Sequence, residues 1–101
     1  MIYKITIPEV APDVEEIRVL EWHGGPGQWF AEGELIVELE THKALVEVRA
    51  GQGGVLRQIL AEAGDWARIG VPLAVFSDTD DEALPASPGD GADLMVEFVI
   101  D

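Results

Sequence analysis

The residues best suited to chemistry surround one lysine, Lys43. The stretch that holds it reads Glu40, Thr41, His42, Lys43, Ala44. Residues 36–40 before the lysine and 44–49 after it are rich in β-branched side chains that alternate with charged ones, the period-two pattern of half-buried strands. This pattern predicts a tight hairpin with the amine of Lys43 exposed at its tip. Because Lys4 is the only other lysine, an enzyme that modifies an exposed turn amine would meet one clear target.

The other candidate groups give little support for catalysis or metal binding. The chain has no cysteine, which excludes thiol chemistry, disulfides and cysteine-based metal sites within it. His23 and His42 lack the close spacing to other ligands that is typical of a metal site, so we expect none. Acids near the hairpin could suggest general acid–base catalysis, but strand alternation favours a solvated acidic face that partners recognise electrostatically. These acids are Glu38, Glu40 and Glu47.

Composition narrows the class of protein. With 101 residues, 48% of them hydrophobic, the chain forms one small domain. Its net charge of -14 repels nucleic-acid phosphates and anionic lipid headgroups, so we expect neither nucleic acid nor membrane as a partner. No apolar run approaches a membrane span, and residues 1–7 alternate like a strand instead of forming a signal peptide. We therefore expect a cytoplasmic location.

The chain repeats itself at a spacing of 37 residues, at which the segment 27–33 recurs as 64–70. Glycines, tryptophans and apolar positions all recur in this register, which predicts two similar halves. Each half is interpreted as strand, glycine-bounded turn and strand, and Gly33 and Gly70 fall at equivalent turns where positive φ is expected. Residues 55–63 have fair helical propensity, but the repeat favours a strand there, and no other part of residues 14–76 resembles a helix.

The C-terminal quarter differs in composition. Residues 77–93 are rich in acids, proline, alanine and glycine, which predicts a flexible acidic linker after a domain formed by residues 1–76. Residues 94–101 then alternate as a strand of unknown pairing. Because its apolar face would be an aggregation hazard if exposed, we expect it to pair with a sheet edge in its own chain or in a second copy, so self-association through 94–101 stays open.

Taken together, residues 5–76 resemble the lipoyl domain of the 2-oxo acid dehydrogenase complexes, in the biotinyl/lipoyl attachment family. The resemblance is carried by Pro8, Trp22 with Pro26-Gly27, Gly33-Glu34, Glu40-Thr41, Lys43-Ala44, Gly54, Gly64-Asp65 and Gly70. It implies an all-β fold: a flattened β-barrel, or barrel-sandwich hybrid, of two four-stranded sheets related by a pseudo-twofold axis. The 37-residue repeat suggests the same twofold independently.

The resemblance also implies a function. Lys43 would carry lipoic acid in amide linkage, with Glu40, Thr41, His42 and Ala44 as hairpin neighbours. The arm would shuttle acyl groups and reducing equivalents, so the chain would be a non-catalytic carrier domain, free-standing or part of a dihydrolipoyl acyltransferase component. Implied partners are a lipoate ligase or lipoyl transferase, the decarboxylating dehydrogenase component, the acyltransferase component and dihydrolipoyl dehydrogenase.

The sequence departs from the family pattern at three places, and these departures concern recognition by partner proteins. His42 stands where Asp is usual, Ala11-Pro12-Asp13 replaces a glycine-flanked acidic loop, and Gln28 replaces the first Gly-Asp pair while Asp65 keeps the second. Two alternatives stay open. A biotinyl carrier would set methionines on both sides of the lysine, which His42 and Ala44 do not match. An unmodified acidic interaction module would keep the fold without the arm.

Overall fold

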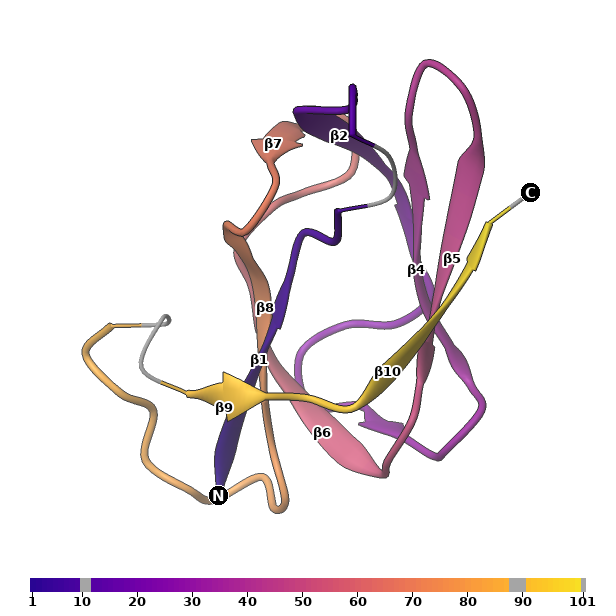
Figure 1. Cartoon of the computed structure of the whole chain (residues 1–101). Helices are drawn as coiled ribbons and strands as arrows, with labels where there is room; N and C mark the ends of the chain where they lie inside the picture. Colours follow the sequence, from indigo (N-terminus) through magenta and orange to yellow (C-terminus); the bar gives the residue numbers. More distant parts are fainter. Residues whose placement is uncertain (10–11, 88–90, 101) are drawn as a thin grey trace.

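Two β-sheets lie face to face in the computed structural model, which describes residues 1–9, 12–87 and 91–100 (Figure 1). The strands are β1 (Ile2–Thr6), β2 (Glu16–Trp22), β3 (Trp29–Phe30), β4 (Leu35–Glu40), β5 (Leu45–Ala50), β6 (Gly54–Ile59), β7 (Trp66–Arg68), β8 (Pro72–Ser77), β9 (Ala92–Asp93) and β10 (Val96–Ile100). Sheet A has the order β3-β6-β8-β1-β9, and sheet B the order β10-β5-β4-β2-β7. The all-β prediction is confirmed.

The 37-residue repeat corresponds to a pseudo-twofold relation between the sheets. Strands β2, β3 and β4 of the first half correspond to β6, β7 and β8 of the second. Equivalent backbone hydrogen bonds join the halves: the Gly27 N–H donates to the Leu56 carbonyl and the Gly64 N–H to the Val19 carbonyl, both at 2.7 Å. Because β3 pairs with β6 and β7 with β2, each half contributes its short strand to the other half's sheet.

The repeated glycines occupy the left-handed backbone region. Gly33 has φ 90° and Gly70 has φ 87°, and the other repeated pair, Gly27 and Gly64, has φ 94° and 96°. A residue with a Cβ rarely adopts this conformation, whereas glycine does so at little cost. The turns predicted at equivalent positions are therefore confirmed. The strand predicted over residues 55–63 is confirmed as far as Ile59, where β6 ends.

The core fills the space between the two sheets. The inward side chains of alternating positions are apolar and fully buried, and the Phe30 and Phe76 rings from opposite halves meet at 6.0 Å between centroids. Trp22 packs against this core and donates its indole N–H to the Ala61 carbonyl at 2.9 Å. Trp29 and Trp66, which recur in the repeat, are exposed and lie in the short strands β3 and β7.

The structure differs from the four-stranded sheets that the resemblance implied, because the C-terminal segment adds a fifth strand to each. Strand β9 pairs in parallel with β1 at the edge of sheet A, and β10 pairs antiparallel with β5 at the edge of sheet B. Between them Leu94 is buried in the core, and its N–H donates to the Lys4 carbonyl at 2.8 Å. The strand predicted at 94–101 thus pairs within its own chain, but as the shorter β10, which begins at Val96 and not at Leu94.

Part of the segment interpreted as a linker also contacts the domain. The Asp78 N–H donates to the Met1 carbonyl at 3.2 Å, and the Lys4 ammonium donates to the Gly91 carbonyl at 2.6 Å. Residues 88–90 of this segment lie outside the described residues. The described parts of residues 77–93 therefore bond to the N-terminal residues near both ends of the segment.

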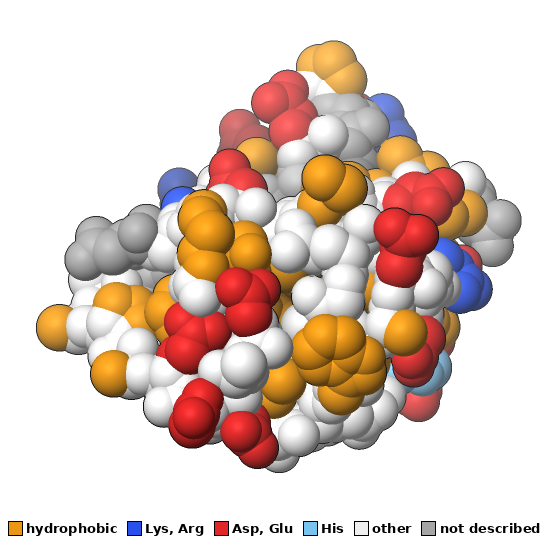
Figure 2. Space-filling view, turned by 90° about the horizontal axis from the view of Figure 1, so that it is seen from below, with side chains coloured by type: hydrophobic (Ala, Val, Ile, Leu, Met, Phe, Trp, Pro, Cys, Tyr) orange, Lys and Arg blue, Asp and Glu red, His pale blue; other side chains and the backbone are white. Residues whose placement is uncertain are grey.

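Acidic side chains dominate the surface. Figure 2 shows them spread between exposed hydrophobic groups, with few basic ones on that face. In the described part of the chain, no helix is long and apolar enough to cross a membrane.

Candidate functional site

Lys43 lies at the tip of the hairpin that joins β4 to β5, the long loop at the upper right of Figure 1. The strands pair in antiparallel register up to Glu40 and Leu45, which leaves residues 41–44 for the turn. Both strands are held in the middle of sheet B, between β2 and β10. The hairpin is therefore a rigid support that projects the turn into solvent, as predicted.

The Thr41 side chain organises this turn. Its Oγ1 accepts the N–H of Lys43 at 3.0 Å and that of Ala44 at 2.9 Å, while the Thr41 N–H donates to the Ala44 carbonyl at 2.9 Å. Thr41 is 6% exposed, so its hydroxyl is shielded from competing water. Two-residue hairpin loops usually need positive φ, but no described non-glycine residue has it here. The threonine hydroxyl instead satisfies the turn's backbone donors.

The two lysines differ in accessibility. The Lys43 side chain is 52% exposed, whereas that of Lys4 is 20% exposed. Lys4 also donates to the Gly91 carbonyl and lies 3.6 Å from the Asp93 carboxylate, between β1 and β9. Lys43 is therefore the lysine that a modifying enzyme reaches without displacing a strand.

An ion pair joins Lys43 to Asp13, in the loop between β1 and β2. The hydrogen bond from Lys43 lowers the pKa of the Asp13 carboxyl below its ordinary value, and the nearby His42 adds to the effect. Both side chains are about half exposed, so the pair contributes little to stability. The sequence indicated Asp13 only as part of an unusual loop, because nothing in the local pattern shows that Asp13 reaches the hairpin. Ala11 of that loop lies outside the described residues.

An open hollow of about 490 Å³ lies beside the hairpin. It is lined by Asp13, Glu15, Glu16, His42 and Trp66. Glu40, at the end of β4, faces the neighbouring strand β2, where Arg18 lies 3.8 Å from its carboxylate. The hollow beside Lys43 is therefore mostly acidic, with one exposed indole. Its acids are not Glu38, Glu40 and Glu47, from which the sequence predicted an acidic face.

Comparison with known proteins agrees with this geometry. Residues 3–76 match the family described as biotin-requiring enzyme (Biotin_lipoyl). The chain is 33% identical over 85 residues to the dihydrolipoyllysine-residue succinyltransferase component of the 2-oxoglutarate dehydrogenase complex from Bacillus subtilis, covering 84% of this chain and 20% of that protein. Identity to the Staphylococcus saprophyticus counterpart is 39% over 75 residues, 74% of this chain and 18% of that one. The chain thus spans about a fifth of these relatives.

A solved structure covers the same region. The lipoyl domain of the 2-oxoglutarate dehydrogenase complex from Azotobacter vinelandii is 32% identical and superposes with a TM-score of 0.66 over 74% of this chain and 95% of that domain. The family match extends from β1 to β8 and includes the hairpin with Lys43. The chain belongs to the biotinyl/lipoyl attachment family, and its fold is that of a lipoyl domain.

Proposed function

We propose that this chain is a lipoyl carrier domain in which Lys43 bears lipoic acid through an amide bond. The observation that carries the proposal is the position of Lys43, the more exposed of two lysines, at the tip of a hairpin whose turn is fixed by the buried Thr41. Relatives that carry dihydrolipoyllysine in their names support it.

The residues around Lys43 fit such a group. Amide formation needs an amine that projects beyond the backbone, and a turn of defined shape lowers the ordering entropy at enzyme recognition. When bound, lipoic acid supplies a dithiolane that accepts acyl groups and electrons. The chain itself contributes no cysteine that could exchange with this disulfide. Its described residues position the arm, and we propose no catalytic role for them.

We infer that the partners are the components of a 2-oxo acid dehydrogenase complex, together with the enzyme that attaches lipoic acid. The acidic hollow beside Lys43 favours partner surfaces with basic groups, because opposite charges steer the encounter. Relatives named as components of such complexes support the general class of partner. The proposed location is cytoplasmic.

The test is modification of the full chain by a lipoate ligase with lipoate and ATP, followed by intact mass and peptide mapping. We expect one lipoyl group on Lys43, and none on Lys43→Arg. A matched control exchanges two neighbours, His42→Lys with Lys43→His, which keeps composition and charge but moves the amine by one position. We expect that variant to be modified much more slowly.

A parallel reaction with biotin ligase and biotin separates the two branches of the family. Modification at Lys4, or biotinylation in place of lipoylation, would overturn the assignment. A chain that neither ligase modifies would support the alternative of an unmodified acidic interaction module.

A further inference from the structure

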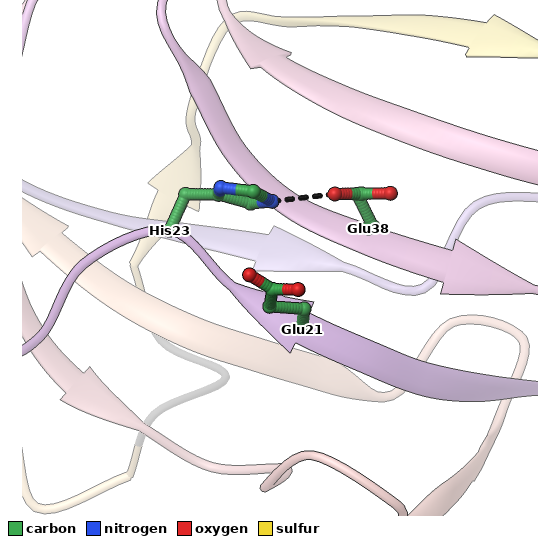
Figure 3. Close-up of side chains that lie close together, drawn as sticks. All are labelled: Glu21, His23 and Glu38. Atoms are coloured by element: carbon green, nitrogen blue, oxygen red, sulfur yellow. Dashed lines mark hydrogen bonds and ion pairs between the residues drawn. The ribbon is translucent and has the colours of Figure 1, made fainter.

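A second cluster of polar side chains lies on the outer face of sheet B, away from the hairpin tip. It consists of Glu21 in β2, His23 directly after β2, and Glu38 in β4. Figure 3 shows the His23 ring directed at the Glu38 carboxylate, with the Glu21 carboxylate reaching toward both from the neighbouring strand. One ligand atom from each residue lies within 4.8 Å of the others, and His23 Nε2 is 2.6 Å from Glu38 Oε1. Spacing along the chain predicted no metal site at His23, because Glu38 lies 15 residues away in sequence.

The strand ladder fixes these three positions. Glu21 and Glu38 are directly opposite each other in the antiparallel pair of β2 and β4. The His23 N–H continues the ladder by donating to the Ile36 carbonyl at 2.8 Å. Glu21 and His23 are two residues apart, so both side chains leave the same face of the sheet. The cluster therefore stands on a rigid part of the fold and needs no ordering of a loop.

The fold does not require these residue types. At the pseudo-twofold equivalent positions, Gln58 is opposite Val75, and the Leu60 N–H donates to the Leu73 carbonyl at 3.0 Å. The same backbone frame in sheet A thus carries Gln58, Leu60 and Val75 where sheet B carries Glu21, His23 and Glu38. Architecture alone therefore gives no reason for two acids and an imidazole to meet here.

Repulsion between the carboxylates also disfavours this grouping in the absence of a cation. Like charges directly opposite each other on adjacent strands are destabilising. Glu38 is opposite Glu21 on one side and opposite Glu47 on the other, so it is the middle of a row of three acids. The Arg49 guanidinium lies 3.2 Å from the Glu47 carboxylate, whereas the Glu38 carboxylate contacts the His23 ring. A cation held between Glu21 and Glu38 would relieve their repulsion.

We propose that Glu21, His23 and Glu38 form a binding site for one divalent transition-metal ion, for which Zn²⁺ is the best fit. One imidazole nitrogen and two carboxylates suit the borderline character of Zn²⁺ better than that of Mg²⁺ or Ca²⁺, which take oxygen ligands. Three protein ligands leave a tetrahedral ion one position for water. The site is independent of any group on Lys43.

The three ligand atoms need to move only a short distance to coordinate Zn²⁺. Zn²⁺ binds nitrogen and carboxylate oxygen at about 2.0–2.2 Å, which places tetrahedral ligand atoms roughly 3.3 Å apart. The three atoms now lie within 4.8 Å of one another, so the long glutamate side chains close the difference by rotation about their own bonds. The metal would lie between His23 Nε2 and Glu38 Oε1, which are now 2.6 Å apart and must separate by under about 1 Å.

The experiment is Zn²⁺ titration of the full chain in competition with a chromogenic chelator, with thermal unfolding measured alongside. We expect one equivalent to bind, and the melting temperature to rise by about 6–11 °C when free Zn²⁺ is about ten times its dissociation constant. His23→Gln, Glu21→Gln and Glu38→Gln should each weaken binding roughly tenfold or more. Matched controls are His42→Gln, which removes the other histidine, and Glu47→Gln, which removes an acid from the same face. His42→Gln should bind as the wild type does, and Glu47→Gln, which removes a neighbouring charge but no ligand atom, should weaken binding much less than the three ligand variants do.

A combined variant, Glu21→Gln with His23→Leu and Glu38→Val, copies the residues that sheet A uses at the equivalent positions. It should fold in metal-free buffer, because that frame already accommodates them, yet bind no Zn²⁺. Binding that survives His23→Gln, or that His42→Gln weakens equally, would show only diffuse attraction to an acidic surface and would overturn the proposal. Failure of the wild-type chain to bind a stoichiometric ion would overturn it as well.

Discussion

Gly33 offers the most direct test of how the repeat determines the backbone. Its φ is 90°, and a Cβ added there would meet no atom within 4 Å. Gly33→Ala would therefore introduce no clash, and its cost would come from the backbone conformation alone. Non-glycine residues in the left-handed region cost on the order of 1–3 kcal/mol, offset by about 0.4–1 kcal/mol because alanine restricts the unfolded chain.

We expect a net loss of about 1–2 kcal/mol in the free energy of unfolding for Gly33→Ala, and a similar loss for Gly70→Ala at the equivalent turn. For a domain of this size the melting temperature should fall by about 4–16 °C. Urea unfolding at constant m-value and calorimetry would measure both quantities.

Gly25 supplies a matched control. A Cβ at Gly25 would also meet nothing within 4 Å, but its φ is outside the positive region. Gly25→Ala should therefore change stability by less than about 0.5 kcal/mol or raise it slightly. If Gly33→Ala and Gly25→Ala gave the same small change, positive φ would not be the reason for glycine at position 33.

Two further predictions concern the hairpin and the C-terminal segment. Because the hydrogen bond from the Lys43 ammonium is the largest cause of the lowered pKa of Asp13, converting the amine to an amide should raise that pKa toward its ordinary value in an NMR titration. The pKa of Asp81, which is lowered mainly by the Thr79 hydroxyl, should not move. Since the folded-state pKa of Asp13 is depressed, its small contribution to stability is present above the unfolded pKa and is lost as pH falls through the folded one. Modification of Lys43 should weaken this pH dependence, and an unchanged Asp13 pKa would show that the pair does not form in solution. Leu94→Ala should lower the free energy of unfolding by about 2–4 kcal/mol, because Leu94 is buried in the core. The control Met95→Ala, at a residue that is 64% exposed, should be nearly neutral when both variants are unfolded in urea. Equal, small effects would mean that β9 and β10 are not part of the cooperative fold.

Much of the central fold could be predicted because its signals are local or repeated. Side-chain alternation around residues 36–49 identifies the two strands of the hairpin, and the polar residues between them identify its tip. Recurrence of glycines at a fixed spacing identifies equivalent turns, since few other residues tolerate positive φ. The position of Lys43 at the tip follows from the same local pattern.

The pairing of distant segments could not be predicted in the same way. Any apolar strand edge could accept residues 94–101, and only the closed arrangement of the two sheets places β10 beside β5 and Leu94 in the core. The contact between Asp13 and Lys43 likewise joins residues 30 positions apart in the chain, which no local pattern brings together.

The sequence by itself determined the hairpin lysine, the twofold repeat and its glycine turns, because alternation and backbone preference act within a few residues of each position. The tertiary structure alone decided which side chains meet across strands. Glu21 and His23 are close in sequence, but Glu38 joins them only because β4 pairs with β2 in one particular register. A shift of that register by one residue would turn Glu38 toward the core, so the grouping is a property of strand pairing and not of any local motif.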